Sequence, residues 1–352
     1  MNEFIPADRE YLTRVAGDLR RSAGEVVRGM SVAVVYGPVS AEDQLYLAKC
    51  PPGQLSVNAL SATLAELGTR SAVLDPCRAS FIPDVSRFDV VLSNLHGPFG
   101  EDGRLQGLLD YLRMPYCGSG VAASAIAADK VLCKRMMEAL AVPTPAWSLA
   151  PDTPAGWPVM VKPRMGGSSV GMSLVRDERD FDLAVARAGG ESSGHSVLIE
   201  EHIPGVPVTV GMLELPGGAI VVFPPLATVV HAGDFYDADA KLDVQGEGTV
   251  ACTTADLPRP ALEALRKASV QLWEGLGCNG MARADFIAAL DGRVYALEVN
   301  TTPGMSFDSN FMMAAGLCGM RHADVLMAII HEAMTRPRYD APLPVPDFSA
   351  GS

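Results

Sequence analysis

The chain lacks the patterns that mark several classes of protein. No apolar run approaches the length of a membrane span, and the N-terminus carries no signal-peptide pattern. The seven cysteines include no C-x-x-C pair, so neither a zinc nor a disulfide framework is indicated. Basic residues are not clustered, and the formal charge of −13 argues against nucleic acid as a partner. We therefore expect a cytoplasmic enzyme or binding protein, with reduced thiols, that binds neither membrane nor nucleic acid.

The composition is that of an ordinary globular α/β protein. The 352 residues are 48% hydrophobic and 20% charged, which is enough chain for two or three domains. Apolar residues at helical spacing predict an amphipathic helix over residues 7–28. This helix precedes the first domain and has two candidate roles, packing on that domain or on a partner subunit.

Strands and helices alternate in the next part of the chain. Residues 31–37 form an apolar run, a helical pattern follows over residues 56–68, and two further strand-like runs end at "SNLHG". This alternation predicts a doubly wound parallel sheet, with function at the carboxyl ends of its strands. Those ends hold Glu42, His96 and Glu101.

The remainder of the chain predicts more strands, three helices and one long loop. Residues 123–142 form a helical pattern that ends at a proline linker, and "PVMVKPRMGGSSVGMSLV" contains two strand-like runs joined by a glycine-serine loop. Two further strands lie in "SVLIEEHIPGVPVTVGML", and two more helices over "ALEALRKASVQLWEGLG" and "HADVLMAIIHEAMTR". Residues 231–258 are polar and contain glycine, which indicates a functional lid or a disordered loop.

The most informative segment is a predicted hairpin with charged residues on one face. Asp291-Gly292 separates two alternating apolar runs, a strong hairpin signal. With these two residues as the turn, Asp285 lies opposite Glu298 and Arg283 lies opposite Asn300, all on one face.

Two carboxylates placed opposite each other repel, unless something neutralises them. A hard divalent cation does so, and carboxylate and amide oxygens are the ligands that magnesium prefers. The alternative is a structural ion cluster neutralised by Arg283, although one arginine does not balance Asp285 and Glu298. We interpret the hairpin as a magnesium site.

A second candidate site follows Lys162. Gly166, Gly167, Ser168 and Ser169 form a run of small residues whose backbone N–H groups can hold phosphate oxygens, with the lysine as countercharge. A plain connection between two strands explains the same pattern. The chain contains neither the Walker A pattern nor the dinucleotide-binding glycine pattern.

Four blocks of sequence together resemble the D-alanine–D-alanine ligases of the ATP-grasp superfamily. They are "LHGPFGEDGRLQGLLDYLRMPYCGSGVAASAIAADK", "VKPRMGGSSVGMS", "ARADFI" and "LEVNTTPGMS". The resemblance runs in order from about residue 31 to the last helix. It implies an ATP-grasp fold, an N-terminal α/β domain followed by two α+β subdomains that hold ATP. It also implies an ATP-dependent ligase that activates one amino acid as an acyl phosphate and joins it to a second.

The resemblance assigns a role to each matching residue. It implies that Asp285, Glu298 and Asn300 bind two magnesium ions, with manganese as the alternative metal, and that Arg283 and the Gly304 backbone stabilise the oxyanion. The implied ATP-binding residues are Lys130, Lys162, Gly167, Ser168, Ser169, Glu200, Glu201 and Ile203. The implied residues around the two amino acids are Glu42, Ser168, His96 and Glu101, with Lys241, Ser309 and Asn310 at the second substrate. Plain structural readings exist for three of them: His96 as a core histidine, Glu101 as a loop acid and Ser309 as a helix N-cap.

Two residues depart from the family pattern. Leu242 stands where the family has a lid tyrosine that hydrogen-bonds towards Glu42 and Ser168, and Pro207 stands where the family has a glutamate for the ATP ribose. These departures favour, as an alternative, a ligase that makes a depsipeptide or a non-standard amide in a resistance or natural-product pathway. A nucleotide-binding regulator without catalysis is a further alternative. The resemblance also implies a homodimer.

These expectations divide the chain into five parts. They are an N-terminal helical extension (1–30), an α/β substrate domain (31–118), a central ATP-grasp subdomain (119–203), a C-terminal ATP-grasp subdomain with the lid loop 231–258 and the metal site (204–336), and a flexible tail (337–352).

Overall fold

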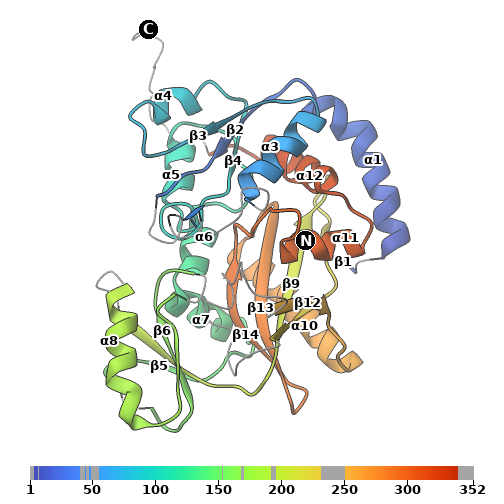
Figure 1. Ribbon diagram of the computed structural model, residues 1–352. Coiled ribbons are helices and arrows are strands. Elements are labelled where there is room, and N and C mark those ends of the chain that lie inside the picture. The colour runs from blue at the N-terminus through green and yellow to red at the C-terminus, as the bar shows by residue number, and fades with distance from the viewer. Residues whose placement is uncertain are drawn as a thin grey trace.

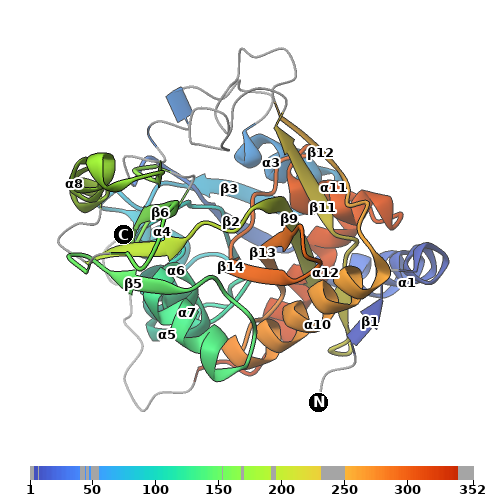
Figure 2. The ribbon, with the colours of Figure 1, turned by 90° about the horizontal axis from the view of Figure 1, so that it is seen from below.

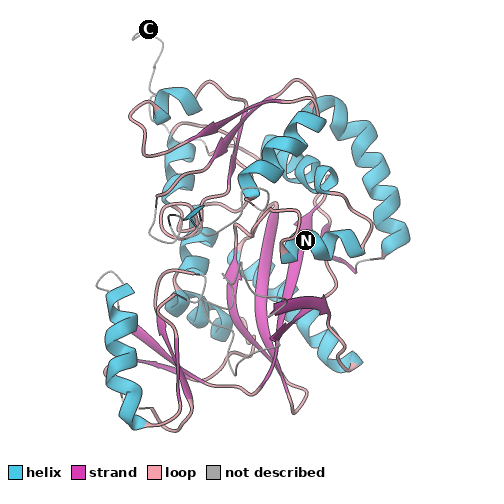
Figure 3. Cartoon of the chain, in the orientation of Figure 1, coloured by secondary structure: helices cyan, strands magenta, loops and turns pink. Residues whose placement is uncertain are grey.

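The computed structural model describes residues 4–6, 8–39, 44, 47–48, 55–152, 154–167, 170–191, 196–230 and 250–339. In this part of the chain the strands form three separate sheets, each with helices packed against it (Figures 1 and 3). The fold is therefore a mixed α/β arrangement, as the sequence predicts.

The first sheet confirms the predicted parallel layer. Its strands are β2 (Ser31–Val35), β3 (Arg70–Leu74) and β4 (Val90–Ser93), in the order β3-β2-β4 and all parallel. Buried valines and leucines fill β2 and β4, as expected for strands covered on both faces. The helices of this layer are α3 (Ser56–Glu66), α4 (Phe81–Val85) and α5 (Arg104–Tyr111).

The two ends of the chain meet on this sheet. The predicted first helix is α1 (Arg9–Val27), and it packs along α12 (His322–Thr335), which in turn contacts α3 and β4 (Figure 1). Arg20 donates two hydrogen bonds to the fully buried Asp324, at 2.7 and 2.6 Å. The helix α1 thus packs within its own chain, on the C-terminal helix that covers the N-terminal sheet.

A short N-terminal strand was not predicted. β1 (Phe4–Pro6) pairs in parallel with β10 (Ile220–Val222) at the edge of a different sheet (Figure 2). Three residues are too few to show an alternating pattern, so only the pairing partner reveals this strand.

The prediction of a single helix over residues 123–142 is wrong, because the structure contains two helices there. α6 (Val121–Ala128) and α7 (Lys130–Ala139) are separated by Asp129, whose backbone is extended. The Asp129 carboxylate accepts hydrogen bonds from the N–H groups of Val131 and Leu132, so it caps α7. The break places Lys130 at the first position of the second helix.

The second sheet contains the strands around the glycine-serine loop. Its order is β5-β8-β6-β7, all antiparallel, with α8 (Phe181–Glu191) packed on β6. The strands are β5 (Trp147–Leu149), β6 (Val159–Pro163), β7 (Ser173–Val175) and β8 (Val197–Glu201), and a short 3-10 helix (Glu178–Asp180) precedes α8. The predicted pair of strands on either side of the glycine-serine loop is confirmed as β6 and β7.

The third sheet has seven strands and is covered by α10 (Arg259–Leu276) and α11 (Asn310–Leu317). Besides β1 and β10 it contains β9 (Gly205–Glu214), β11 (Leu226–Val230), β12 (Val250–Thr254), β13 (Met281–Ala289) and β14 (Val294–Asn300). β12 lies inside the segment predicted as the lid loop, so that prediction extends too far; residues 231–249 lie outside the described residues.

The hairpin β13–β14 confirms the predicted pairing, although the predicted turn is wrong. Asp285 lies opposite Glu298 and Arg283 lies opposite Asn300. Ala289 donates its N–H to the Arg293 carbonyl, so the loop has three residues, ending at Gly292 with φ +85°. The longer loop shifts the pairing by one residue, and a β-bulge between the turn and Asp285 shifts it back.

Among the described residues, no single helix is both long and apolar enough to cross a membrane. Among the described helices, only the pair α11 and α12, bent by 105° at the break between them, has the length and the apolar composition of a membrane span.

Candidate active site

Strands of the second and third sheets, together with the loop after β4, line one large cavity of about 920 Å³, a size typical of small-molecule sites. The hairpin β13–β14 forms one wall, the loop after β6 and the end of β8 form a second, and the loop after β4 closes a third side. The wall includes many of the predicted site residues, namely His96, Glu101, Lys130, Lys162, Gly167, Glu200, Ile203, Arg283, Asp285, Glu298, Asn300, Gly304, Ser309 and Asn310.

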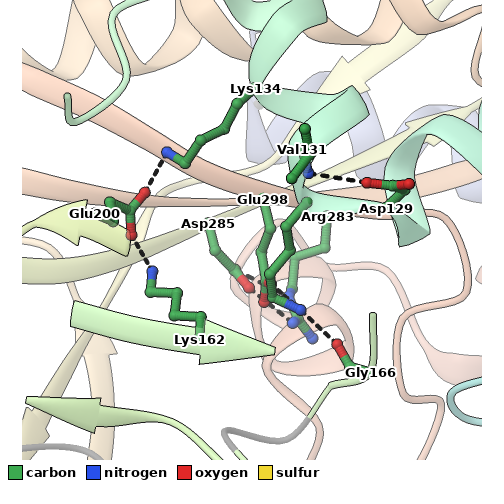
Figure 4. A network of polar contacts seen from close by, with 10 residues as sticks. Asp129, Val131, Lys134, Lys162, Gly166, Glu200, Arg283, Asp285 and Glu298 are labelled. Atoms are coloured by element: carbon green, nitrogen blue, oxygen red, sulfur yellow. Dashed lines mark hydrogen bonds and ion pairs between the residues drawn. The ribbon is translucent and has the colours of Figure 1, made fainter. Parts of the chain in front are cut away.

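The hairpin presents its four polar side chains to this cavity. Arg283 donates two hydrogen bonds to Asp285, at 3.0 and 2.8 Å, and Thr209 on β9 donates a third at 2.6 Å. Asn300 accepts a hydrogen bond from the Thr302 N–H at 2.7 Å, which orients its amide. The period of the strands therefore places these groups on one surface, of which Figure 4 shows Arg283, Asp285 and Glu298.

A second cation lies on this surface besides Arg283, which corrects one step of the sequence argument. Burial lowers the pKa of Arg283, but Asp285 outweighs burial and the pKa is raised, so the guanidinium stays charged. Lys130 brings a second cation to within 4.0 Å of Glu298, and it also donates a hydrogen bond to the Gly166 carbonyl. The sequence argument counted only Arg283 because Lys130 lies more than 150 residues away from the hairpin.

The donor set nevertheless fits a magnesium–phosphate complex. Asp285 and Glu298 remain partly accessible, with side chains 22% and 33% exposed, and Asn300 adds an amide oxygen. The described residues contain no cluster of three or more His, Cys, Asp or Glu side chains that could hold a metal alone. Magnesium commonly takes one or two carboxylates and completes its octahedron with substrate phosphates and water, so two carboxylates and an amide are sufficient.

A buried ion triad lies at the other end of the cavity. Glu200 on β8 is 1% exposed and pairs with both Lys162 on β6 and Lys134 on α7 (Figure 4). Burial raises the pKa of Glu200, but the two lysines outweigh burial and lower it. Burial lowers the pKa of Lys134. Lys162 and Glu200 both line the cavity, so the triad holds a lysine and a carboxylate together at this wall.

Lys134 was missed by the sequence reasoning. It does not line the cavity and acts on Glu200 from behind, while also donating a 2.7 Å hydrogen bond to Thr144. The available signal was its place four residues after Lys130 in one predicted helix, which puts both lysines on one side of that helix.

The cavity wall beyond Glu200 is mostly apolar. Met160, Ile203 and Val206 contribute to it, and so does Pro207, the residue that departs from the family pattern. His202 also lines this region, and burial together with Arg176 and Lys162 lowers its pKa. Glu201 is exposed and is not part of the wall, so its side chain does not join the other predicted ATP-binding residues.

Two residues after β4 face the hairpin across the cavity. His96 Nδ1 lies 3.7 Å from a Glu101 oxygen, and both side chains are 20% exposed. Glu101 is close enough to Arg283 to raise the pKa of the guanidinium. The structure therefore brings the N-terminal loop to the hairpin, and neither residue is a fully buried core residue or a freely solvated one.

Gly304, Ser309 and Asn310 form the wall beyond Arg283. Ser309 is the N-cap of α11, where its hydroxyl accepts a hydrogen bond from Met312 N–H at 3.4 Å. Ser309 is thus a helix N-cap, the structural role considered from the sequence, and it also lines the cavity. The predicted residues Glu42, Ser168, Ser169 and Lys241, and also Leu242, lie outside the described residues.

Comparison with known proteins identifies the family. A family model described as D-ala D-ala ligase C-terminus matches residues 143–331, and one described as D-ala D-ala ligase N-terminus matches residues 21–119. The chain belongs to the D-alanine–D-alanine ligase family. The members of this family are ATP-grasp enzymes, so the chain is an ATP-dependent ligase, as the resemblance predicted.

Relatives and solved structures agree with this assignment. The chain is 36% identical over 322 residues to a D-alanine–D-alanine ligase of Gloeobacter violaceus, covering 87% of this chain and all of that protein. It is 33% identical to one of Synechococcus, covering 87% and 94%. The D-alanine–D-alanine ligase of Bacillus anthracis, solved in complex with ATP, superposes with a TM-score of 0.71 at 27% identity, covering 87% of this chain and 98% of that one. The family models leave α1 largely and β1 entirely outside their matches.

Proposed function

We propose that this ligase activates D-alanine with ATP and joins it to a second D-amino acid, using the cavity between the three sheets. The observation that supports this most directly is the convergence of Arg283, the pair Asp285 and Glu298, and the lysine-rich end of the cavity on one space. Such a space accommodates a nucleotide whose phosphates lie near the hairpin and whose base lies near Glu200.

The nucleotide is held by charge at one end and by apolar contact at the other. Lys130 and Lys162 bind the phosphates together with Gly167, and Glu200 with the backbone near Ile203 binds the base. The family resemblance assigns Ser168 and Ser169 to the same phosphates. Asp285, Glu298 and Asn300 hold up to two magnesium ions, with manganese as a substitute. When bound, the metal neutralises charge on the phosphates during phosphoryl transfer.

The reaction has two chemical steps. In the first, an oxygen of the D-alanine carboxylate attacks the γ-phosphorus of ATP, the bond to the β-phosphate oxygen breaks, and ADP leaves. In the second, the amine of the second amino acid attacks the carbonyl carbon of the acyl phosphate, inorganic phosphate leaves, and the amine loses a proton. Arg283 and the backbone of Gly304 stabilise the oxygen that becomes negative in the tetrahedral intermediate.

The remaining predicted residues position the two amino acids. Glu42 and Ser168 hold the first, with His96 and Glu101 between it and the attacking amine, while Lys241 and Ser309 hold the carboxylate of the second. We further propose a homodimer in the cytoplasm, where ATP is available to a ligase. The family resemblance supports the dimer.

Phosphate release tests the proposal. The protein is incubated with ATP, magnesium and D-alanine, alone and paired with other D- or L-amino acids or with D-lactate, and products are identified by mass spectrometry. D-alanine alone should release phosphate and give the dipeptide. Phosphate release at background level with D-alanine would contradict the proposal, and a D-lactate ester as the main product would favour the depsipeptide alternative.

Glu298→Ala tests the role of the hairpin. Loss of a residue that only orients a metal ligand already costs about 10- to 100-fold in metal affinity or activity, so loss of a ligand should lower kcat by more than about 100-fold. Glu298 is one-third exposed, so the urea midpoint of unfolding should be retained. The matched control is Asp291→Ala, an exposed acid at the tip of the same hairpin that pairs with Arg293. Full activity in Glu298→Ala would refute the metal assignment.

A further inference from the structure

A buried histidine contacts the loop between β14 and α11, residues 301–309, which carries Gly304. His322, the first residue of α12, is 8% exposed. Its Nε2 lies 2.8 Å from the carbonyl oxygen of Met305, and its Nδ1 lies 2.8 Å from the hydroxyl of Thr63 on α3. α3 and α12 contact each other (Figure 1), so this histidine joins the loop to two helices of the N-terminal layer.

The two contacts fix the tautomer of His322. A carbonyl oxygen only accepts hydrogen bonds, so Nε2 carries the proton and donates it to Met305. Nδ1 is then unprotonated and accepts a hydrogen bond from the hydroxyl of Thr63. Burial lowers the pKa of His322 against the opposing effects of the Met305 carbonyl and of Glu66, so the imidazole is neutral at pH 7, as this arrangement requires.

The same histidine contacts the loop at a second place. The ring of Phe307 lies 4.9 Å from the imidazole, measured between ring centres. Ser306, which stands between Met305 and Phe307, lines the cavity. His322 therefore holds the loop on both sides of a residue of the cavity wall, while its own side chain is not part of that wall.

Gly304 lies between two fixed points of the backbone. On one side the Thr302 N–H donates a hydrogen bond to Asn300 at 2.7 Å, and on the other the Met305 carbonyl accepts one from His322. The proline between Thr302 and Gly304 has a fixed φ, whereas glycine has the widest choice of backbone conformations. The direction of the Gly304 N–H therefore depends on how firmly the Met305 carbonyl is held.

We infer that His322 is a positioning residue for the ligase reaction, which holds the Met305 carbonyl and thereby directs the Gly304 N–H at the place where the oxyanion forms. Thr63 supports it by fixing the imidazole tautomer. This inference rests on the proposed function, because that function gives the Gly304 N–H its task. A donor displaced by about 1 Å lowers a reaction rate by up to about 100-fold, so the effect should appear in kcat.

Two substitutions that each keep one of the two hydrogen bonds test the inference. The amide nitrogen of glutamine reaches about as far as Nε2, so His322→Gln can still donate to Met305. The amide of asparagine reaches about as far as Nδ1, so His322→Asn can contact Thr63 and not Met305. Dipeptide formation from D-alanine, ATP and magnesium should show kcat lowered by about 10- to 100-fold in His322→Asn and by less than about threefold in His322→Gln. The KM for ATP should stay within about twofold of wild type in both, because the histidine does not line the cavity.

The pair of variants distinguishes positioning from a contribution to stability alone. Each variant loses one buried hydrogen bond, so a role in stability alone predicts similar losses in the urea midpoint and a wild-type kcat in both. Activity is measured well below the melting transition of each variant, so that the molecules assayed are folded. The control is Gln271→Leu on α10, which removes a side-chain hydrogen bond to the Leu140 carbonyl, at 3.2 Å and away from the cavity wall, and should keep the wild-type kcat.

A milder variant serves if the His322 variants do not fold. Thr63→Val removes the hydroxyl that fixes the tautomer and keeps the shape of the side chain. It should lower kcat by about two- to tenfold, the value of one hydrogen bond, with the KM for ATP unchanged. A wild-type kcat in folded Thr63→Val would overturn the inference.

The outcomes separate the inference from the proposed function. Equal kcat values in His322→Gln and His322→Asn, or a change confined to the KM for ATP, contradict the inference and leave the ligase assignment intact. Background phosphate release by the wild-type protein with every pair of amino acids contradicts the proposed function itself.

Discussion

The buried triad of Glu200, Lys134 and Lys162 allows a prediction in which two single substitutions have very different effects. Glu200→Gln removes the only anion and leaves two lysines facing each other in a buried place. Lys134→Met removes one cation and leaves Glu200 with the other. Both substitutions keep the approximate size of the side chain, so packing changes little.

The magnitudes follow from which charge is left without a partner. Removing one partner of a buried ion pair typically costs about 3–5 kcal/mol, because the remaining charge is desolvated and unpaired. We expect about 4 kcal/mol for Glu200→Gln, where two like charges remain. We expect about 1 kcal/mol for Lys134→Met, because Glu200 keeps Lys162 and the burial that lowers the pKa of Lys134 no longer opposes folding. Thr144, which loses the Lys134 hydrogen bond, still donates to the Ala296 carbonyl at 2.8 Å.

Urea unfolding at two pH values is the assay. In Glu200→Gln the pKa of Lys134, which burial already lowers, loses the opposing effect of Glu200 and should fall further below that of the unfolded chain. A lowered lysine pKa gives a stability deficit that is large at neutral pH and shrinks as the pH rises towards about 10, where the lysines lose their protons in both states. Lys134→Met should show no such recovery relative to wild type. Equal losses in the two variants, or a Glu200→Gln deficit that does not change with pH, would refute this account of the triad.

Two further predictions concern α12. Burial raises the pKa of Glu332 from 4.5 to about 7, against the opposing effect of Arg336. Between these two pH values the folded state binds a proton that the unfolded state releases. The resulting stability is fully present below pH 4.5 and is lost as the pH rises through 7. In urea unfolding of the wild type, this contribution to the free energy of unfolding should fall by roughly 2–3 kcal/mol between pH 5 and pH 8. The contribution should be missing in Glu332→Gln. An identical pH dependence in both proteins would contradict the role given to Glu332. Arg20→Ala should lower the free energy of unfolding by about 1–2 kcal/mol, which is less than for a fully buried pair because Arg20 is 41% exposed. The control Arg21→Ala, at an exposed residue, should change the free energy of unfolding by less than about 0.5 kcal/mol. Similar losses in both variants would show that the buried Asp324 carboxylate does not need its partner.

The sequence could predict the hairpin that carries the candidate metal ligands, because strand pairing within a hairpin depends on nearby residues. The alternation of side chains requires Arg283 and Asp285 to share a face whatever the rest of the fold does. The predicted pairs Arg283–Asn300 and Asp285–Glu298 were right although the turn was not, since the three-residue loop and the bulge compensate each other beyond Asp285. A local pattern does not reveal a bulge, because the extra residue is accommodated by its partners across the sheet.

The sequence could not predict which distant charges reach the site. Lys130 approaches Glu298 because Asp129 breaks the helix and α7, which begins at Lys130, packs on β14. Lys134 on α7, which packs on β14, reaches Glu200 on β8, and neither contact leaves a mark in the residues between them. The balance of charge on the candidate metal surface was therefore misjudged from the hairpin alone.

The amino-acid sequence by itself determined the family, the alternation of the first sheet and the face of the hairpin on which Asp285, Glu298 and Asn300 lie. These features depend on motif identity and on the period of a strand, which are properties of neighbouring residues. The tertiary structure decided the ion triad around Glu200, the packing of α1 on α12 and the approach of Lys130 to Glu298. Each of these joins residues from different elements, and such contacts arise only when the elements pack, since burial and charge act through space and not along the chain.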